Sequence, residues 1–410
     1  MKPQNDLIHK IIEEESLLTM FQPLISMKRK SVLGYEALTR GLDPETGEII
    51  PPDKLFGLCR DRETLLDLDR LCRKKALETF APISKKNRSL LLSLNMDAAV
   101  LSDIVGKMGT TLKFAEKAGM PPGNIIIEII ESKAGDEKVL ETFVSTSRCQ
   151  GFLIALDDVG TGHSNLDRIP RLRPDIIKID RSLIRSIENS FHNYEITGSL
   201  IRMAQKTGTL PLAEGVETIE EALTLMQMDV DVFQGFYFGK PCHRDRISAY
   251  DSTPILSAAS RFKSHIVEKY AAEKLMRTQY EALAMKLRTS LEKCACDCEA
   301  CQSTITEFID SNKHIECAYI LDDHGVQTTD TICNPYRLKE RRRLIYNPAP
   351  KGADHSLKDY YLSLISGRKW HITRPYISLA SGNRCLTVST VFHNHEQRFV
   401  LCVDIAIDHK

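Results

Sequence analysis

Short apolar runs in the first part of this chain repeatedly end on a charged or amide side chain. Runs of four to eight apolar residues predict buried strands, and a polar residue just beyond such a strand can point into the space above a sheet. Six runs end in this way, on Glu36, on Asn95, on Glu128, on the pair Asp157 and Asp158, on Lys178 with Asp180, and on Glu214. Because these endings recur in series, they predict that the side chains converge on one place.

Helix-like and strand-like segments alternate from residue 1 to about residue 250. Residues 195–208, for example, have a helical pattern that Gly208 is placed to end, and a strand-like run follows at 209–213. Eight strand candidates occur in this part of the chain. The prediction is an α/β fold, a modified (β/α)8 barrel of the TIM type over residues 1–250.

The first two strand candidates, residues 20–26 and 31–38, are separated only by the polar stretch 27–30. Parallel neighbours need a crossover of about a dozen or more residues, whereas antiparallel neighbours can be joined by a tight turn. The spacing therefore predicts a hairpin in which the first barrel strand runs antiparallel to the second.

Residues 251–311 contain almost no glycine or proline and carry one apolar stripe at helical spacing. The stripe consists of Met276, Tyr280, Leu283, Leu287, Leu291, Cys294, Cys298, Cys301, Ile305 and Phe308. It predicts a long amphipathic connecting helix, or two helices in tandem. Because such a stripe needs burial, we expect a homodimer.

Residues 312–410 differ in character, since β-branched and aromatic runs alternate with turn signals. This pattern predicts a smaller α+β domain with an antiparallel sheet. The run 370–379 and the strand-like segment 387–392 resemble PAS-like or Cache-type sensor modules. That resemblance implies either a small-molecule ligand or a dimerisation domain without one.

Charge and hydropathy narrow the class of protein. The chain carries 55 basic and 55 acidic residues, a formal net charge of zero, which argues against a dominant basic surface for nucleic acid or a membrane. No apolar stretch approaches the ~20 residues that span a bilayer, and the N-terminal segment lacks the apolar core of a signal peptide. We therefore expect a cytoplasmic protein with no membrane span.

The chain has 12 cysteines, which in a reducing compartment are expected to be thiols rather than a disulfide framework. Four of them crowd into residues 294–301. Cys294, Cys298 and Cys301 fall on the apolar stripe and suit core thiols, whereas a metal site or a redox sensor is the alternative.

The side chains that end the barrel strands are mainly oxygen donors, the ligands that hard divalent cations take. So many acids in one place would repel one another, and bound Mg²⁺ or Mn²⁺ would resolve that repulsion. No set of histidines and cysteines occurs at these strand ends, which disfavours zinc. Two ions about 3.5–4 Å apart can activate water for phosphodiester cleavage, and Lys178 suits a charge partner for that water or for a phosphate oxygen.

Seven short motifs follow one another in order within residues 18–245. They are GYEALTR (34–40), SLN (93–95), IEIIES (127–132), LDDVGTG (156–162), IKIDRS (177–182), AEGVET (213–218) and QGFYFGKP (234–241). Together they resemble the EAL-domain phosphodiesterases, which hydrolyse the bacterial messenger cyclic di-GMP to linear pGpG. The resemblance implies a bacterial signalling protein with that activity, controlled by its C-terminal domain.

The resemblance also implies a role for each matching residue. The implied ligands of a first metal ion are Glu36, Asn95, Glu128 and Asp157. The implied ligands of a second ion are Asp157, which bridges the two ions, Asp158 and Glu214. The implied substrate contacts are Leu38, Arg40, Asp180 and Gln234.

Four further expectations rest on the same resemblance. Lys178 and Glu217 would position the attacking water, with Glu214 as its candidate base. Glu131 would anchor the loop that follows Asp158. The two-metal site would use Mg²⁺ or Mn²⁺. Ca²⁺ would be inhibitory, since in this family it supports binding without turnover.

The sequence departs from the usual family pattern mainly in the loop after the paired aspartates. Here Val159, His163 and Asn165 stand in place of Phe, Tyr and Ser, while Ile130 and Gly41 stand in place of Thr and Trp. None of the five is an implied ligand, so they bear on turnover more than on binding. The alternative function is therefore a cyclic di-GMP receptor with slow or no turnover, and a third is a barrel phosphodiesterase for another substrate.

Overall fold

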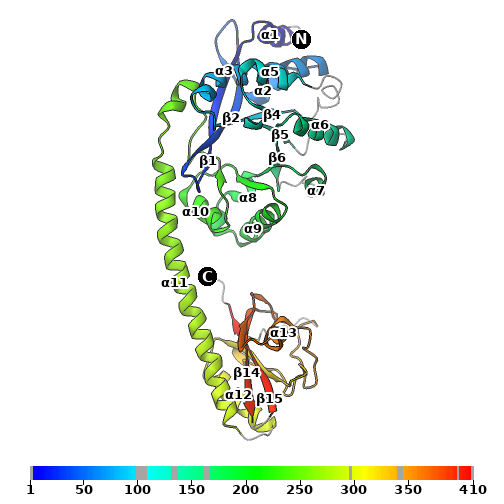
Figure 1. Ribbon diagram of the computed structural model, residues 1–410, viewed down its shortest axis with the longest axis vertical. Coiled ribbons are helices and arrows are strands. Elements are labelled where there is room, and N and C mark those ends of the chain that lie inside the picture. Colours follow the sequence, from blue (N-terminus) through cyan, green and yellow to red (C-terminus); the bar gives the residue numbers. More distant parts are fainter. Residues whose placement is uncertain are drawn as a thin grey trace. The chain divides into compact units, whose positions relative to one another are not determined.

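The computed structural model describes residues 3–97, 109–130, 137–160, 167–294, 298–338, 345–394 and 397–407. The chain forms two compact units and passes from the first to the second between Ile266 and Val267 (Figure 1). That point lies inside helix α11, Thr253–Glu292, the helix that begins just after the predicted end of the barrel domain at residue 250. The first turns of α11 pack with the barrel unit, because Ile255 and Ala258 are buried in its core.

Eight strands of the described chain form a closed barrel in the first unit. They are β1 Leu17–Ser26, β2 Ser31–Leu42, β4 Leu91–Met96, β5 Ile125–Ile130, β6 Leu153–Val159, β7 Ile176–Ile179, β8 Leu210–Ala213 and β9 Val232–Phe233. β1 closes the ring by pairing antiparallel with both β2 and β9, and the other barrel neighbours are parallel. The short strand β3, Ile49–Ile50, extends from β2. The predictions of an eight-stranded TIM-type barrel and of an initial hairpin are confirmed.

Helices surround the barrel, and local sequence signals set their ends. The described helices of this unit before α11 are α1 Pro3–Glu13, α2 Pro52–Gly57, α3 Arg62–Lys86, α5 Thr110–Ala118, α6 Glu137–Cys149, α7 Arg168–Leu172, α8 Arg181–Ile184, α9 Phe191–Lys206 and α10 Ile219–Gln227. Thr218 and Glu221 form a capping box that starts α10. Gly208 follows the end of α9 with a positive φ of 77°, as its predicted place at the helix end requires.

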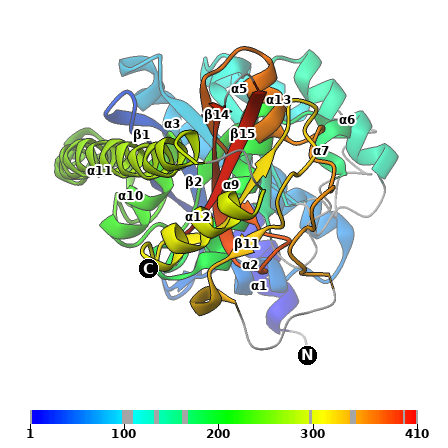
Figure 2. The same ribbon diagram turned by 90° about the horizontal axis from the view of Figure 1, so that it is seen from below.

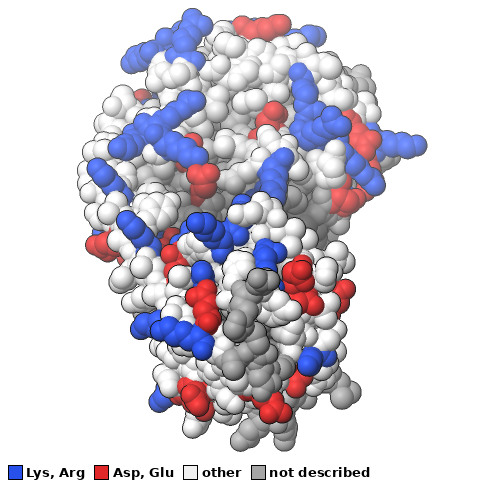
Figure 3. Space-filling view, turned by 60° about the horizontal axis from the view of Figure 1, so that its bottom comes forward, with Lys and Arg blue, Asp and Glu red and all other residues white. Residues whose placement is uncertain are grey.

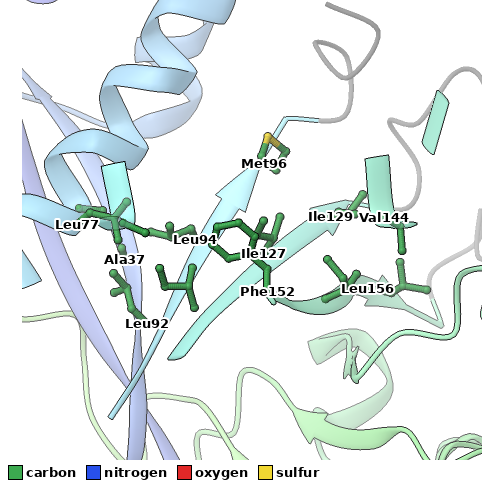
Figure 4. Close-up of a cluster of buried hydrophobic side chains, with 14 of the residues drawn as sticks. Ala37, Leu77, Leu92, Leu94, Met96, Ile127, Ile129, Val144, Phe152 and Leu156 are labelled. Carbon is green, nitrogen blue, oxygen red and sulfur yellow. The ribbon is translucent and has the colours of Figure 1, made fainter. Parts of the chain in front are cut away.

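The outward side chains of the strands join the surrounding helices in an apolar layer. Leu92 and Leu94 of β4 and Ile127 of β5 are buried in this layer with Leu77 of α3 and Val144 of α6 (Figure 4). Each buried aliphatic side chain of this kind contributes about 1.5–3 kcal/mol relative to exposure. The layer therefore holds the strands in register, and with them the side chains that point inward.

The inward side chains at the middle of the strands form an apolar floor inside the barrel. This floor consists of Leu24, Ile126, Ala155, Ile176, Leu212 and Val232, all buried. Because side chains alternate between faces along a strand, the next inward position lies two residues further on. The floor therefore fixes where the polar strand ends must point.

The second unit is built on an antiparallel sheet in the order β11–β10–β15–β14–β12, with β13 also paired to β14. Its strands are β10 Ile315–Leu321, β11 Ile332–Cys333, β12 Trp370–Ile372, β13 Tyr376–Ile377, β14 Arg384–Asn394 and β15 Gln397–Ala406. The long strands β14 and β15 lie side by side (Figure 2). The end of α11 and helix α12, Cys298–Asp310, share one core with the sheet, and α13, Asp359–Ile365, shares another. The prediction of a smaller domain with an antiparallel sheet is confirmed.

The apolar stripe of the connecting segment is divided between two helices, because α11 ends at Glu292 and α12 begins at Cys298. Leu287, Leu291 and Ile305 are fully buried against the sheet of the same unit. The prediction of two helices in tandem is thus confirmed. The second part of the stripe is covered within one chain, so its burial gives no reason for a homodimer.

Basic and acidic side chains are interspersed on the face of the molecule that Figure 3 shows. This agrees with the balanced charge of the sequence, since neither sign dominates that face. Among the described residues, no helix combines the length and the apolar character that crossing a membrane requires.

One carboxylate is buried inside the second unit. Asp404 on β15 is 3% exposed, and it accepts hydrogen bonds from the hydroxyls of Thr387 at 2.8 Å and Tyr376 at 3.4 Å. Burial outweighs these hydrogen bonds and raises the pKa of Asp404 to about 7. The folded protein therefore binds one more proton than the unfolded chain between about pH 4 and pH 7, so this group makes stability fall as the pH rises through that window.

We expect Asp404→Asn to remove this pH dependence. Above about pH 8 the variant should be more stable than the wild type by up to about 4 kcal/mol, since one pKa unit is worth about 1.4 kcal/mol, and below about pH 4 the two should differ little. Urea unfolding followed by the fluorescence of Trp370, the single tryptophan, reports on the second unit. Parallel stability curves across this pH range would refute the assignment.

Candidate active site

A polar layer lies directly above the apolar floor of the barrel. Its members are Gln22, Ser93, Glu36, Glu128, Asp157, Lys178, Glu214 and Gln234. Each follows the alternation of its strand, as Lys178 follows the floor residue Ile176 by two positions. β1 runs in the opposite direction, so Gln22 precedes its floor residue Leu24 and lies opposite Glu36 in the ladder.

Lys178 lies at the centre of this layer and is 1% exposed. Its Nζ is 2.5 Å from Glu214 Oε1 and 2.7 Å from Glu128 Oε2. Asp157 Oδ1 lies 3.5 Å away and Glu36 Oε2 3.9 Å away. One ammonium therefore faces four carboxylates, and the described residues of this cluster keep an excess of negative charge.

Neutral side chains orient two of the carboxylates. Asn95 Nδ2 donates to Glu36 Oε1 at 2.7 Å, and Gln234 Nε2 donates to Glu36 Oε2 at 2.5 Å. Ser93 Oγ donates to Glu128 Oε1 at 2.5 Å. These bonds fix the rotamers of the two glutamates and leave other oxygen lone pairs for a ligand.

The crowding of charges shifts the pKa values in this cluster. Burial and the Glu36 carboxylate raise the pKa of Glu128 to about 8. Burial also raises the pKa of Glu214, against the attraction of Lys178. For Glu36, burial is outweighed by Lys178 and by hydrogen bonds from two amides, which together lower its pKa. The surrounding carboxylates outweigh burial at Lys178 and raise its pKa, so this side chain stays charged.

The donor set fits a hard divalent cation. Asp157, Asp158 and Glu214 each offer a carboxylate oxygen, and these oxygens lie within 4.8 Å of one another. Asp158 takes a left-handed backbone conformation with φ 57°, and its N–H donates to Asp157 Oδ1 at 2.9 Å. Oxygen donors with uncompensated negative charge suit Mg²⁺, Mn²⁺ or Ca²⁺. The described donors include no histidine or cysteine, so zinc fits poorly.

Two cavities adjoin the polar cluster. The first, of about 270 Å³, is lined by Glu36, Lys178 and Glu214, and also by Glu217, whose Oε1 pairs with Arg181 Nη2 at 2.7 Å. The second, of about 400 Å³, has Leu38, Arg40 and Asn95 in its lining. Strand β2 borders both cavities, since Glu36 lines one and Ala37 lines the other. Ala37 faces the opposite side of the strand from Glu36, and the walls of the two cavities meet where Asn95 of the second donates a hydrogen bond to Glu36 of the first.

Glycine is required two residues before Glu36. A Cβ atom at Gly34 would lie 2.4 Å from the carbonyl oxygen of Leu91 on β4. Strands β2 and β4 therefore approach closely at this point, and the approach brings Glu36 within hydrogen-bond distance of Asn95.

Most of the residues that the sequence predicted for this site lie together. Asp180 is at the edge, since its carboxylate caps α8 by accepting from the N–H of Ser182 at 2.8 Å, and it is not in the lining of either cavity. Glu131 lies outside the described residues, as do His163 and Asn165 and the side chain of Ile130.

The other two departures from the family pattern affect packing. Val159 is 1% exposed and belongs to the apolar layer outside the strands. A Cβ at Gly41 would lie 2.9 Å from Leu55 Cδ1, so a tryptophan there would need Leu55 on α2 to move. Neither residue supplies a side chain to the polar layer.

Sequence reasoning missed three side chains of this site, Gln22, Ser93 and Arg181. Ser93 had a detectable signal, because it precedes Asn95 by two positions on one strand and so shares its face. Gln22 interrupts an apolar run, which is also a signal, since buried polar side chains are uncommon. Arg181 has none, because its place depends on how the chain turns into α8.

Comparisons with known proteins agree with this geometry. A sequence profile described as the EAL domain matches residues 4–241. The signaling protein YkoW of Bacillus subtilis is 28% identical over 245 residues, which cover 58% of this chain and 30% of YkoW. The cyclic di-GMP phosphodiesterase PdeA of Borreliella burgdorferi is 28% identical over 248 residues, 59% of this chain and 36% of PdeA. The chain thus spans about a third of the length of these two relatives.

One relative matches over both units. The EAL-domain containing protein YkuI of Bacillus subtilis is 26% identical over 387 residues, 92% of this chain and 91% of YkuI. The crystal structure of YkuI, in complex with substrate c-di-GMP and calcium, covers 100% of both chains with a TM-score of 0.82 and 24% identity. This likeness establishes the fold of the whole chain.

The matched profile covers more than half of the chain, and the strands it spans form the closed barrel in which β2 carries the Glu36-Ala37-Leu38 motif. The chain belongs to the EAL-domain family.

Proposed function

We propose that this protein hydrolyses one phosphodiester bond of cyclic di-GMP to give linear pGpG, in a reaction that needs divalent metal ions. The observation that carries the proposal is the polar cluster, in which four carboxylates surround Lys178 beside an open cavity. The name of PdeA and the bound nucleotide of YkuI support the same substrate.

The proposed metal site holds two ions. Glu36, Asn95, Glu128 and Asp157 are the ligands of the first ion, and Asp157, Asp158 and Glu214 are the ligands of the second. The excess of carboxylates over ammonium groups supports this assignment, as does the mutual approach of the three oxygens of the second set. When bound, the ions supply Lewis-acid polarisation of the phosphate and a lowered pKa of coordinated water. The working ion is Mg²⁺ or Mn²⁺, and Ca²⁺ allows binding but not turnover.

The side chains of the protein bind the nucleotide and handle the proton. Lys178 and Glu217 orient the attacking water, and Glu214 accepts its proton. The water oxygen bonds to phosphorus, one P–O ester bond breaks, and the leaving oxygen takes up a proton. Leu38, Arg40, Asp180 and Gln234 contact the substrate, and the second cavity beside β2 supports this role for Leu38 and Arg40. Glu131 anchors the loop that follows Asp158.

The second unit is the regulatory part of this proposal, a PAS-like module in a cytoplasmic bacterial protein that acts as a homodimer. Met276, in the first part of the apolar stripe, is exposed on α11 and supports the dimer. A cavity of about 400 Å³ supports a small-molecule ligand here. Its wall includes the stacked rings of Phe392 and Phe399, whose centroids are 5.5 Å apart, and the polar side chains of Gln327 and Gln397. Cys301 of α12 also lines it, so a ligand would contact the helix that follows α11.

We expect Glu36→Ala to lower the rate of pGpG formation by more than about a hundredfold, because even the outer partners of metal ligands are worth about 10- to 100-fold. Chromatography of cyclic di-GMP reactions with Mn²⁺ measures the product. Glu45→Ala is the matched control, since Glu45 is an exposed glutamate paired with Lys10. An unchanged rate in Glu36→Ala would remove this residue from the mechanism.

The same assay separates the alternative functions. Wild-type protein that binds cyclic di-GMP tightly yet forms no pGpG over hours would be a receptor, as the altered loop after Asp158 allows. Absence of cyclic di-GMP binding would point to another phosphodiester substrate.

We expect Asp157→Asn to leave the unfolding temperature of the metal-free barrel little changed, because it removes the attraction of Lys178, whose Nζ lies 3.5 Å from Asp157 Oδ1, together with the repulsion of the neighbouring carboxylates. The same change should abolish the stabilisation by Mn²⁺, which for the wild type amounts to about 2.7 kcal/mol at a hundredfold excess over Kd. Calorimetry after EDTA treatment, with and without Mn²⁺, measures both effects. Glu116→Gln removes an exposed carboxylate on α5 and should behave as wild type. A wild-type barrel that Mn²⁺ leaves unchanged would count against the metal site.

A further inference from the structure

The second unit contains a pair of cysteines that the proposed reaction does not use. Cys317 on β10 and Cys333 on β11 are direct partners in the antiparallel ladder. Their Sγ atoms are 2.7 Å apart, and both are free thiols in the structure. The two thiols are therefore placed so that a disulfide bond could form between them.

The backbone around the pair has the geometry that a disulfide needs. The adjacent pair is hydrogen-bonded, since the N–H of Asn334 donates to the carbonyl of Glu316 at 2.8 Å. Hydrogen-bonded and non-hydrogen-bonded pairs alternate along antiparallel strands, so Cys317 and Cys333 form a non-hydrogen-bonded pair. Cα atoms in such pairs are about 4.5 Å apart, within the range of about 4.4–6.8 Å found for disulfides. The strands therefore need no rearrangement to bring the sulfurs together.

We propose that Cys317 and Cys333 form a reversible disulfide, a covalent modification site of the C-terminal unit that small-molecule disulfides install and thiols remove. Other cysteines of the sheet lack this arrangement. Cys402 has Tyr319 and Ser389 as ladder partners, and no cysteine lies opposite Cys385 either.

The reaction proceeds by thiol–disulfide exchange with a compound such as oxidised glutathione. Cys333 is half-buried and Cys317 is fully buried, so the Cys333 thiolate attacks first. It forms a mixed disulfide and releases one glutathione thiolate. Cys317 then loses its proton, and its sulfur displaces the second glutathione. The two cysteines lose two electrons and two protons in all, and one glutathione disulfide becomes two glutathione thiols.

The Cys317–Cys333 disulfide would restrict one wall of the cavity of about 400 Å³ in the second unit. β11 is a two-residue strand at the edge of the sheet, and its pairing with β10 is short. The disulfide would close the segment 318–332, which includes the cavity-lining residues Val326, Gln327 and Thr329. Closing a loop restricts the conformations open to it. Oxidation would therefore restrict the conformations of residues that line the candidate ligand site of the second unit.

Peptide mapping of the full-length protein tests the proposal. Protein equilibrated with oxidised or reduced glutathione is denatured, alkylated with iodoacetamide and digested with trypsin. Both cysteines fall in the single peptide 314–337, because no lysine or arginine lies between Lys313 and Arg337. We expect two alkyl labels after reduction and none after oxidation, with a peptide lighter by two hydrogens. Cleavage before Asp322 and Asp330 should then give fragments that separate only after reduction.

Two variants complete the test. Cys333→Ala should retain one label on Cys317 in oxidised glutathione, whereas Cys149→Ser, which alters an exposed cysteine of the first unit, should lose both labels as the wild type does. Two labels on the wild-type peptide at the most oxidising ratio would overturn the proposal. So would glutathione that stays attached to Cys333 while Cys317 takes the label.

Discussion

The burial of one ammonium among four carboxylates is the interaction on which the polar layer of the barrel depends. Charges removed from water are costly unless they are paired and hydrogen-bonded. Lys178 pairs with the carboxylates, and amide and hydroxyl groups of Asn95, Gln234 and Ser93 bind their remaining oxygens. The apolar floor and the closed ring of strands beneath the layer hold these groups in fixed positions. The surplus negative charge that remains makes the layer a receptor for cations.

Much of this arrangement follows from the alternation of side chains along a strand. Glu128 and Lys178 could be predicted because each ends an apolar run whose phase points it inward. The antiparallel first strand could also be predicted, since the stretch 27–30 is too short for a crossover. These features are local, and local features are what a single sequence records most directly.

Features that depend on a partner element were harder to predict. The periodicity of α11 and α12 marks an apolar face, but it does not say whether a second chain or the sheet of the same unit covers it; for Leu287 and Ile305 it is the sheet. The burial of Ile255 and Ala258 in the core of the first unit is also a tertiary contact that the periodicity of α11 does not indicate. The pairing of Cys317 with Cys333 likewise depends on the register of two strands separated by a long loop.

The tight contact at Gly34 has a wider consequence for reading the EAL motif. A residue that touches no ligand is held to glycine by the carbonyl of a neighbouring strand, while Glu36 two positions later faces the cluster. Tyr35, between them, is buried in the outer layer. The segment that leads into the motif therefore meets two unlike requirements on one face of β2, because a steric limit of barrel assembly at Gly34 and the chemistry of Glu36 stand two residues apart.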